Sequence, residues 1–229
     1  MIKKALIIIQ ILLSVTILDA QNKRADKSTQ AKADTTKKLS AYEKLFDNKK
    51  NVKTSVGLLT LHIVEGKLYF EFPVKLAGKS FLLGSVVDNV SNMNLAYSGQ
   101  RASRPVQICF TKTDSLVLIN LVSSPTLVDS ADTGIKEAVK RSSLPSVLSS
   151  SPILAFNKDS SCVVFDATSF FLSGSKYIGS LNSSSMGGFM QVVSTFNKEL
   201  SSLKDVEAYK NNVAVLSNMT YSLKSYVMG

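Results

Sequence analysis

Apolar and more polar residues alternate along residues 57–73, GLLTLHIVEGKLYFEFP. The large apolar side chains of one set are Leu59, Leu61, Ile63, Leu68, Phe70 and Phe72. A period of two sends alternate side chains to opposite faces of a strand. The tripeptide Glu65-Gly66-Lys67 supplies a short turn with glycine between the two halves. The stretch therefore predicts a β-hairpin, which ends at Pro73 because proline has no N–H for the ladder.

Further runs of strand length follow the hairpin. They lie at residues 80–87, 106–110, 115–122, 153–156, 162–165 and 213–223. Turn-rich stretches at 88–105 and 173–190 predict loops, the second of them mobile. The serines of 142–151 with Pro145 are expected to interrupt the helical pattern at 132–141. Because the connections are short, we expect the strands to pair antiparallel.

Three short segments show helical patterns. Residues 41–50 place Tyr42, Leu45 and Phe46 on one face. Residues 132–141 form a second helical pattern, with a glutamate four positions before an arginine. Thr168 is placed to cap a turn at 169–172. The predicted fold class is mainly β or α+β: an antiparallel, sheet-rich domain with two or three short helices.

The N-terminus has the layout of an export signal. Lys3 and Lys4 precede an apolar run of 14 residues, 5–18, and the small Ala20 offers a cleavage position. The run is shorter than the roughly 20 residues of a membrane-spanning helix, so we expect no stable membrane span after signal cleavage, with an uncleaved anchor as the alternative. The predicted location is the periplasm or the extracellular space.

Basic residues concentrate just after this signal. The chain has a net charge of +10, and residues 21–54 hold ten basic and four acidic side chains. Residues 21–40 are polar and nearly free of large apolar side chains, which predicts a disordered linker. Such a basic arm is a solvated tether or a contact for anionic lipid or nucleic acid. Since aromatic residues are not interleaved with its lysines, we expect no nucleic-acid partner.

Side chains suited to chemistry are few, with one histidine and two cysteines in the chain. His62 opens His62-Ile63-Val64-Glu65, which superficially resembles half of a zinc motif. In a strand, positions i and i+3 lie on opposite faces, whereas the HExxH motif needs one face of a helix. We therefore predict a structural role for His62.

The remaining candidates have structural alternatives. Asp166 with Thr168 forms either a polar site or a cap, and Gly187-Gly188 lies in a Ser/Gly stretch that reads as a loop. In an oxidising compartment, Cys109 and Cys162 form one disulfide or remain two buried thiols. We assign no catalytic, cofactor-binding or metal-binding residue.

Several segments occur in an order that resembles a known family. They are GLLTLHIVEGKLYFEFP, FLLGSVVDNVS, AYSGQ, PVQICF, ILAFNKDSSCVVFDATSFF and DVEAYKNNVAVLSNMTYSL. Over residues 40–223 the chain is similar to the N-terminal region, described as domains of unknown function, of exported zinc-dependent metalloproteases of the Bacteroidota. The family's HExxHxxGxxH zinc helix matches nothing in this chain, so no catalytic or metal residue carries over.

These patterns divide the chain into a signal peptide at 1–20, a disordered linker at 21–40, a short helix and lead-in at 41–56, and a β-rich domain at 57–229. Relative to the family, the last of these is expected to be truncated at its C-terminal end. The implied function is a non-catalytic accessory or pro-region-like module whose partner is a zinc metalloprotease domain or another protein ligand. The alternatives are a free-standing binding module that uses loops 88–105 and 173–190, and an enzyme of unrecognised type.

Overall fold

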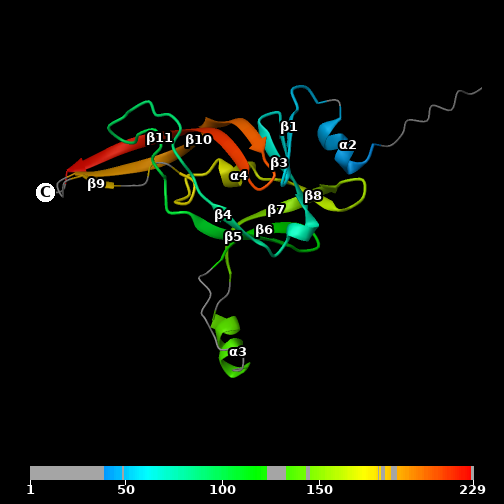
Figure 1. Cartoon of the computed structure of the whole chain (residues 1–229). Helices are drawn as coiled ribbons and strands as arrows, with labels where there is room; N and C mark the ends of the chain where they lie inside the picture. The colour runs from blue at the N-terminus through cyan, green and yellow to red at the C-terminus, as the bar shows by residue number, and fades with distance from the viewer. Residues whose placement is uncertain are drawn as a thin grey trace, which may run out of the picture. The chain divides into compact units, whose positions relative to one another are not determined.

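The computed structural model describes residues 39–47, 49–122, 133–142, 145–179, 181, 184–186 and 190–227. The predicted signal peptide and the linker as far as residue 38 lie outside the described residues. All elements below belong to the unit Leu39–Gly229. The prediction of an antiparallel, sheet-rich fold with few short helices is confirmed (Figure 1).

Most of the unit is an eight-stranded sheet with the order β1-β2-β3-β8-β7-β6-β5-β4. Every neighbouring pair is antiparallel. The strands are β1 (Lys53–Val56), β2 (Thr60–Val64), β3 (Lys67–Pro73), β4 (Ser80–Leu83), β5 (Val106–Lys112), β6 (Leu116–Leu121), β7 (Ser146–Phe156) and β8 (Cys162–Asp166).

The predicted hairpin is β2 and β3, with Val64 opposite Lys67. Glu65 and Gly66 both have positive φ angles, 52° and 79°, which two-residue hairpin turns of the I′ type require. One face carries the predicted apolar set into the core, with Ile63 only half-buried. The other face is not left to solvent, because His62 is also buried, at 6% exposure.

Two predicted strands have different bounds. β4 ends at Leu83 instead of residue 87, and beyond it Val86 forms only an isolated bridge to Arg101. β7 begins at Ser146 instead of residue 153, so the serines that follow the end of α3 belong to a strand that pairs with β6. In this part of the strand Ser151, which is 6% exposed, donates from Oγ to the carbonyl of Asp166 at 2.8 Å.

A second sheet has the order β11-β10-β9, from β9 (Ser184–Met186), β10 (Met190–Ala208) and β11 (Val213–Val227). The predicted strand at 213–223 is confirmed and extended as β11. Its partner β10 was missed, and the predicted loop at 173–190 contains β9 and the first residue of β10. The pairing of β10 with β11 shifts register between Asn197 and Ser202 and between Leu203 and Asp205, which breaks the two-residue period that marks a strand.

The helices are α2 (Ala41–Phe46), α3 (Thr133–Ser142) and α4 (Thr168–Phe171), with a short 3-10 turn η1 (Val74–Leu76). A capping box opens α2, in which Ser40 and Glu43 bond each other's backbone N–H. The prediction to residue 50 was too long, because the polar residues after Phe46 offer no apolar face to dock. α3 confirms its prediction to within one residue, including the Glu137–Arg141 pair at 2.6 Å.

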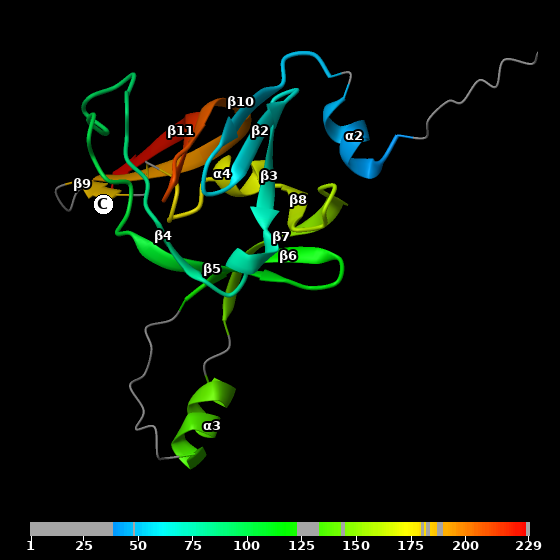
Figure 2. The same ribbon diagram turned by 45° about the vertical axis from the view of Figure 1, so that its right-hand side comes forward.

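The core joins both sheets. Phe70, Phe72, Phe110 and Phe165 contribute from the large sheet, and Val206 of β10, 2% exposed, belongs to the same cluster. Figures 1 and 2 both show the long β10–β11 hairpin on the side of the fold away from β5, β6 and β7. Side chains between the sheets thus pack as in a two-layer β fold.

One end of the hairpin is fixed to the large sheet by backbone contacts. Leu58 N donates to Tyr209 O at 2.7 Å, and Ala208 N donates to Ser55 Oγ at 2.8 Å. Lys53 and Asp205 form an ion pair beside them. Gly57 lies at the closest approach, where an added Cβ would come within 2.5 Å of Tyr209 O.

We predict that Gly57→Ala destabilises the fold by about 1–3 kcal/mol, the usual cost of overpacking, because the backbone of Tyr209 must move. Urea unfolding followed by circular dichroism measures the change. Gly84→Ala is the matched control, since its Cβ would meet only Pro105, at 3.7 Å. Equal stability of the Gly57 and Gly84 variants would contradict the close approach.

Candidate functional site

A cleft of about 840 Å³ lies between β4 with residues 84–89 on one side and the first half of β11 with the β10–β11 turn on the other. Its floor includes four core side chains, each at most 5% exposed: Leu59, Phe70, Ile108 and Phe110. The volume is in the range of about 300–1,000 Å³ that is usual for ligand sites. The cleft is thus large enough to hold a ligand against an apolar floor.

The rim of the cleft is polar, whereas its walls expose apolar side chains. Asp88 and Lys204 are the charged residues of the lining, and its amides come from Asn89, Asn211, Asn212 and Asn218. Leu82 and Val86 are 73% and 64% exposed, and Leu216 on the opposite wall is 37% exposed. An apolar centre with a polar rim is typical of recognition sites.

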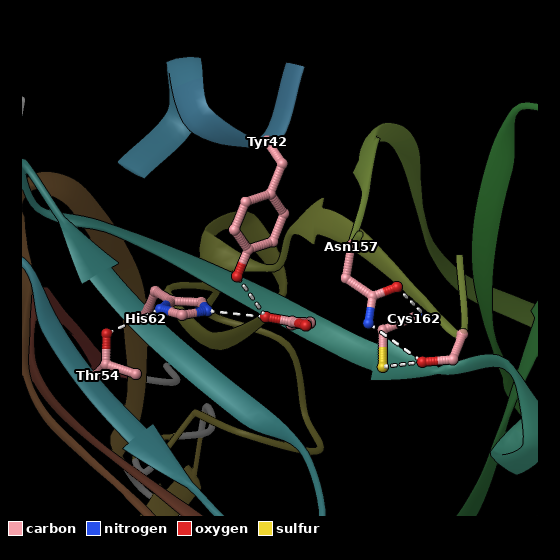
Figure 3. A network of polar contacts seen from close by, with 7 residues as sticks. Tyr42, Thr54, His62, Asn157 and Cys162 are labelled. Carbon is pink, nitrogen blue, oxygen red and sulfur yellow. Dashed lines mark hydrogen bonds and ion pairs between the residues drawn. The ribbon is translucent and has the colours of Figure 1, made fainter. Parts of the chain in front are cut away.

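A separate polar network ties α2 to strands β1, β2 and β3 (Figure 3). Thr54 Oγ1 lies 2.9 Å from His62 Nδ1, and His62 Nε2 lies 3.3 Å from Glu71 Oε2. Tyr42 donates from its hydroxyl to the same carboxylate oxygen at 2.8 Å. The Phe46 ring covers the imidazole with ring centroids 4.3 Å apart. The network therefore docks the short helix on the sheet.

The hydrogen bonds of His62 indicate which nitrogen of its imidazole carries the proton. Because an ionised carboxylate only accepts hydrogen bonds, Nε2 of His62 carries the proton shared with Glu71, and Nδ1 accepts from Thr54. Burial lowers the pKa of His62 below its ordinary 6.5, and it outweighs the nearby Glu71, which acts in the opposite direction. Burial and the bond to Glu71 raise the pKa of Tyr42 to about 12. His62 is therefore neutral although it lies within ion-pair distance of Glu71.

The order hydroxyl–imidazole–carboxylate is that of a catalytic triad, and sequence reasoning did not foresee that Thr54 and Glu71 would meet His62. Strand register explains both contacts. Thr54 lies directly opposite His62 on β1, and Glu71 lies two residues from Tyr69, the residue opposite His62 on β3, and so is on the same face of the sheet. None of Thr54, His62 and Glu71 lines the cleft. A triad also needs donors that face a substrate carbonyl, whereas Phe46 and Tyr42 occupy this face. The arrangement supports the structural role predicted for His62.

The other candidate residues also have structural contacts. Thr168 is not the N-cap of α4, which is Ala167. Its Oγ1 instead accepts from Leu68 N at 2.8 Å, while its own N–H donates to Asp166 Oδ1 at 2.8 Å. The cap prediction was wrong because Thr168 is already inside the helical turn. Gly187-Gly188 lies outside the described residues.

Cys109 and Cys162 are free, half-buried thiols. They lie on β5 and β8, with β6 and β7 between them. Of the two alternatives, a disulfide or two thiols, the structure has the two free thiols. Burial raises the pKa of the Cys162 thiol, which keeps it protonated.

Within the described part of the chain, no three His, Cys, Asp or Glu side chains come together as a metal site would require. The helices that the structure describes include none with the length and apolar character to span a membrane.

Two family models match the chain. One, a domain of unknown function called DUF5117, matches residues 99–228, and another, called DUF5118, matches residues 39–90. The chain belongs to the DUF5117 family. Comparisons with curated proteins and with solved structures each found no match.

The DUF5118 and DUF5117 regions share one sheet. The DUF5118 region supplies β1, β2 and β3 at one end of the sheet and β4 at the other end. The DUF5117 region supplies the four strands between them, so that β3 pairs with β8 and β4 pairs with β5. The cleft also has walls from both regions. The two sequence families are therefore one structural unit in this chain.

We predict that, after the chain is cleaved between the two regions, the two fragments remain associated. A protease cleavage site inserted after Met93, which is 80% exposed, divides the chain without touching either strand pairing. The halves should co-elute from a size-exclusion column in buffer and separate in 6 M guanidinium, which is the control. Separate elution in buffer would show that the two regions fold independently.

We predict that His62 makes stability depend on pH. Since its folded-state pKa is lowered, its contribution is complete above the ordinary value of 6.5 and is lost as the pH falls through the folded pKa. The free energy of unfolding, from urea titrations at pH 7.5 and 5.0, should therefore fall more in the wild type than in His62→Gln. The carboxylates titrate in both proteins, so their contribution to the fall in the free energy of unfolding cancels in the comparison. An equal fall in both would mean that His62 is not held neutral.

Proposed function

We propose that this protein is an exported, non-catalytic accessory module that packs against a zinc-metalloprotease domain and positions it. The ordered segments at residues 40–223 that resemble the leading region of such proteases in the Bacteroidota support this role. The two matched regions, 39–90 and 99–228, cover nearly the same stretch. In this proposal the zinc chemistry resides in the partner.

The cleft is the observation that carries the proposal. Its floor is apolar, and Leu82 and Val86 on its wall are more than half exposed. Exposed apolar side chains beside a preformed cleft are typical of sites for another molecule. A binding surface of this kind supplies what an accessory module needs, since its role is to hold a partner.

A free-standing binding module is the second candidate. Loop 88–105 was predicted to recognise a ligand, and Asp88 and Asn89 at its start line the cleft. From loop 173–190, the described residue Ile178 reaches the same cleft. This candidate differs from the first in its partner, not in its site.

Melting experiments test the accessory role. We expect the mature chain, from residue 21 on, to melt at a higher temperature when mixed with the catalytic domain of a metalloprotease of the resembling family. A partner that binds only the folded state stabilises it, by about 2.7 kcal/mol at a hundredfold excess over Kd. An unrelated zinc protease is the control. An unchanged melting temperature at saturating concentration would count against the accessory role and leave the free-standing module.

A further inference from the structure

We propose that the cleft binds an extended, uncharged segment of the partner polypeptide, added as a strand between β4 and β11. This inference rests on the proposed function, because it names how the partner is held. The occupant would bring apolar side chains at alternate positions. Three features of the cleft argue for it: the strand edges in its walls, the apolar side chains on floor and walls, and the balance of charge in its lining.

Both walls of the cleft are edge strands. β4 has β5 as its neighbour in the large sheet, and β11 has β10 in the small one. Residues 81–83 of β4 and 213–219 of β11 line the cleft, and within the described part of the chain neither strand pairs with a second strand. An edge strand presents backbone N–H and C=O groups that an extended chain can pair with. A polypeptide in this position meets such groups on both sides, whereas a compact apolar ligand leaves them unpaired.

The side chains around the cleft fit the alternation of a strand. Apolar groups on one face of the inserted segment would rest on the floor of Phe70, Ile108 and Phe110. On β11, Val213 and Val215 face the core, while Leu216 is exposed on the other face. The inserted segment would therefore alternate core-facing and exposed side chains, as the wall strand β11 does.

Charge and length limit the occupant further. Among the lining residues Asp88 and Lys204 have opposite charges, and the other polar ones are neutral. Charge complementarity then favours a segment without net charge over an acidic or a basic one. The seven residues Val213–Met219 of β11 border the cleft, so an extended segment of about six or seven residues would span it.

The test uses the mature chain and three capped hexapeptides that alternate Val with Thr, Leu with Ser, and Phe with Asn. Isothermal titration calorimetry measures their Kd. We expect at least one of them to bind with a Kd below 1 mM (~4 kcal/mol). Methylation of its alternate amide nitrogens, which removes the donors of one edge and keeps every side chain, should weaken binding at least tenfold.

Variants locate the binding. Leu82→Lys and Leu216→Lys change exposed side chains on the two walls and should each weaken binding at least tenfold. Val56→Lys is the matched control, because Val56 lies on the edge strand β1 and its exposure, 72%, equals that of Leu82 within one percentage point. It does not line the cleft, and its variant should bind as the wild type does.

Two results would overturn the inference: no binding by any of the three peptides, or binding that neither amide methylation nor the wall variants weaken. The melting experiment with the protease domain, repeated with Leu82→Lys, separates this failure from that of the proposed function. If the protease domain still raises the melting temperature of Leu82→Lys and no peptide binds, the accessory role stands and strand addition is rejected. If a peptide binds but the protease domain does not change the melting temperature, strand addition stands and the protease domain is rejected as the partner.

Discussion

The pairing of β3 with β8 is the interaction on which the rest of the structure depends. It joins Tyr69–Pro73 to Cys162–Asp166, which are some ninety residues apart in the chain. Without it β1, β2 and β3 would be separated from the other five strands of the large sheet. With it the Phe70 and Phe165 rings come within 5.7 Å, and both join the core cluster. Because β3 belongs to one family region and β8 to the other, the core forms only when both are present.

The position of the β10–β11 hairpin then decides where a ligand can enter. Its turn is held against β1 and β2 through Leu58 and Tyr209, where Gly57 allows the two backbones to approach. At the opposite end of the large sheet, no corresponding pairing joins β4 to β11 among the described residues. The core side chains between these two strands are therefore reached from the cleft. The cleft is thus a consequence of this difference between the two ends of the large sheet.

Sequence patterns predicted those parts of the fold in which apolar and polar residues keep the regular spacing of a strand or a helix. The β2–β3 hairpin and α3 are examples. The capping box of Ser40 and Glu43, which opens α2, is a sequence signal that the prediction for residues 41–50 did not use. The patterns failed for β10, because register shifts at Asn197 and Leu203 interrupt its alternation. Strand geometry predicted that His62 lies in a strand, but not which side chains it contacts. The cleft was not predicted either, since it forms between residues 81–89 and β11, whose partner β10 was missed.

The open edges of β4 and β11 impose a cost that favours a binding role. Edge strands with exposed apolar side chains promote aggregation, and soluble proteins usually shorten, charge or cover them. β4 has four residues, and beyond it Val87 and Gly99 hydrogen-bond within the adjoining loop. These features limit the free edge, yet Leu82 and Leu216 remain exposed across the cleft. A lysine at either position would protect the edge without disturbing the core. That both positions are leucine is explained if another chain covers them.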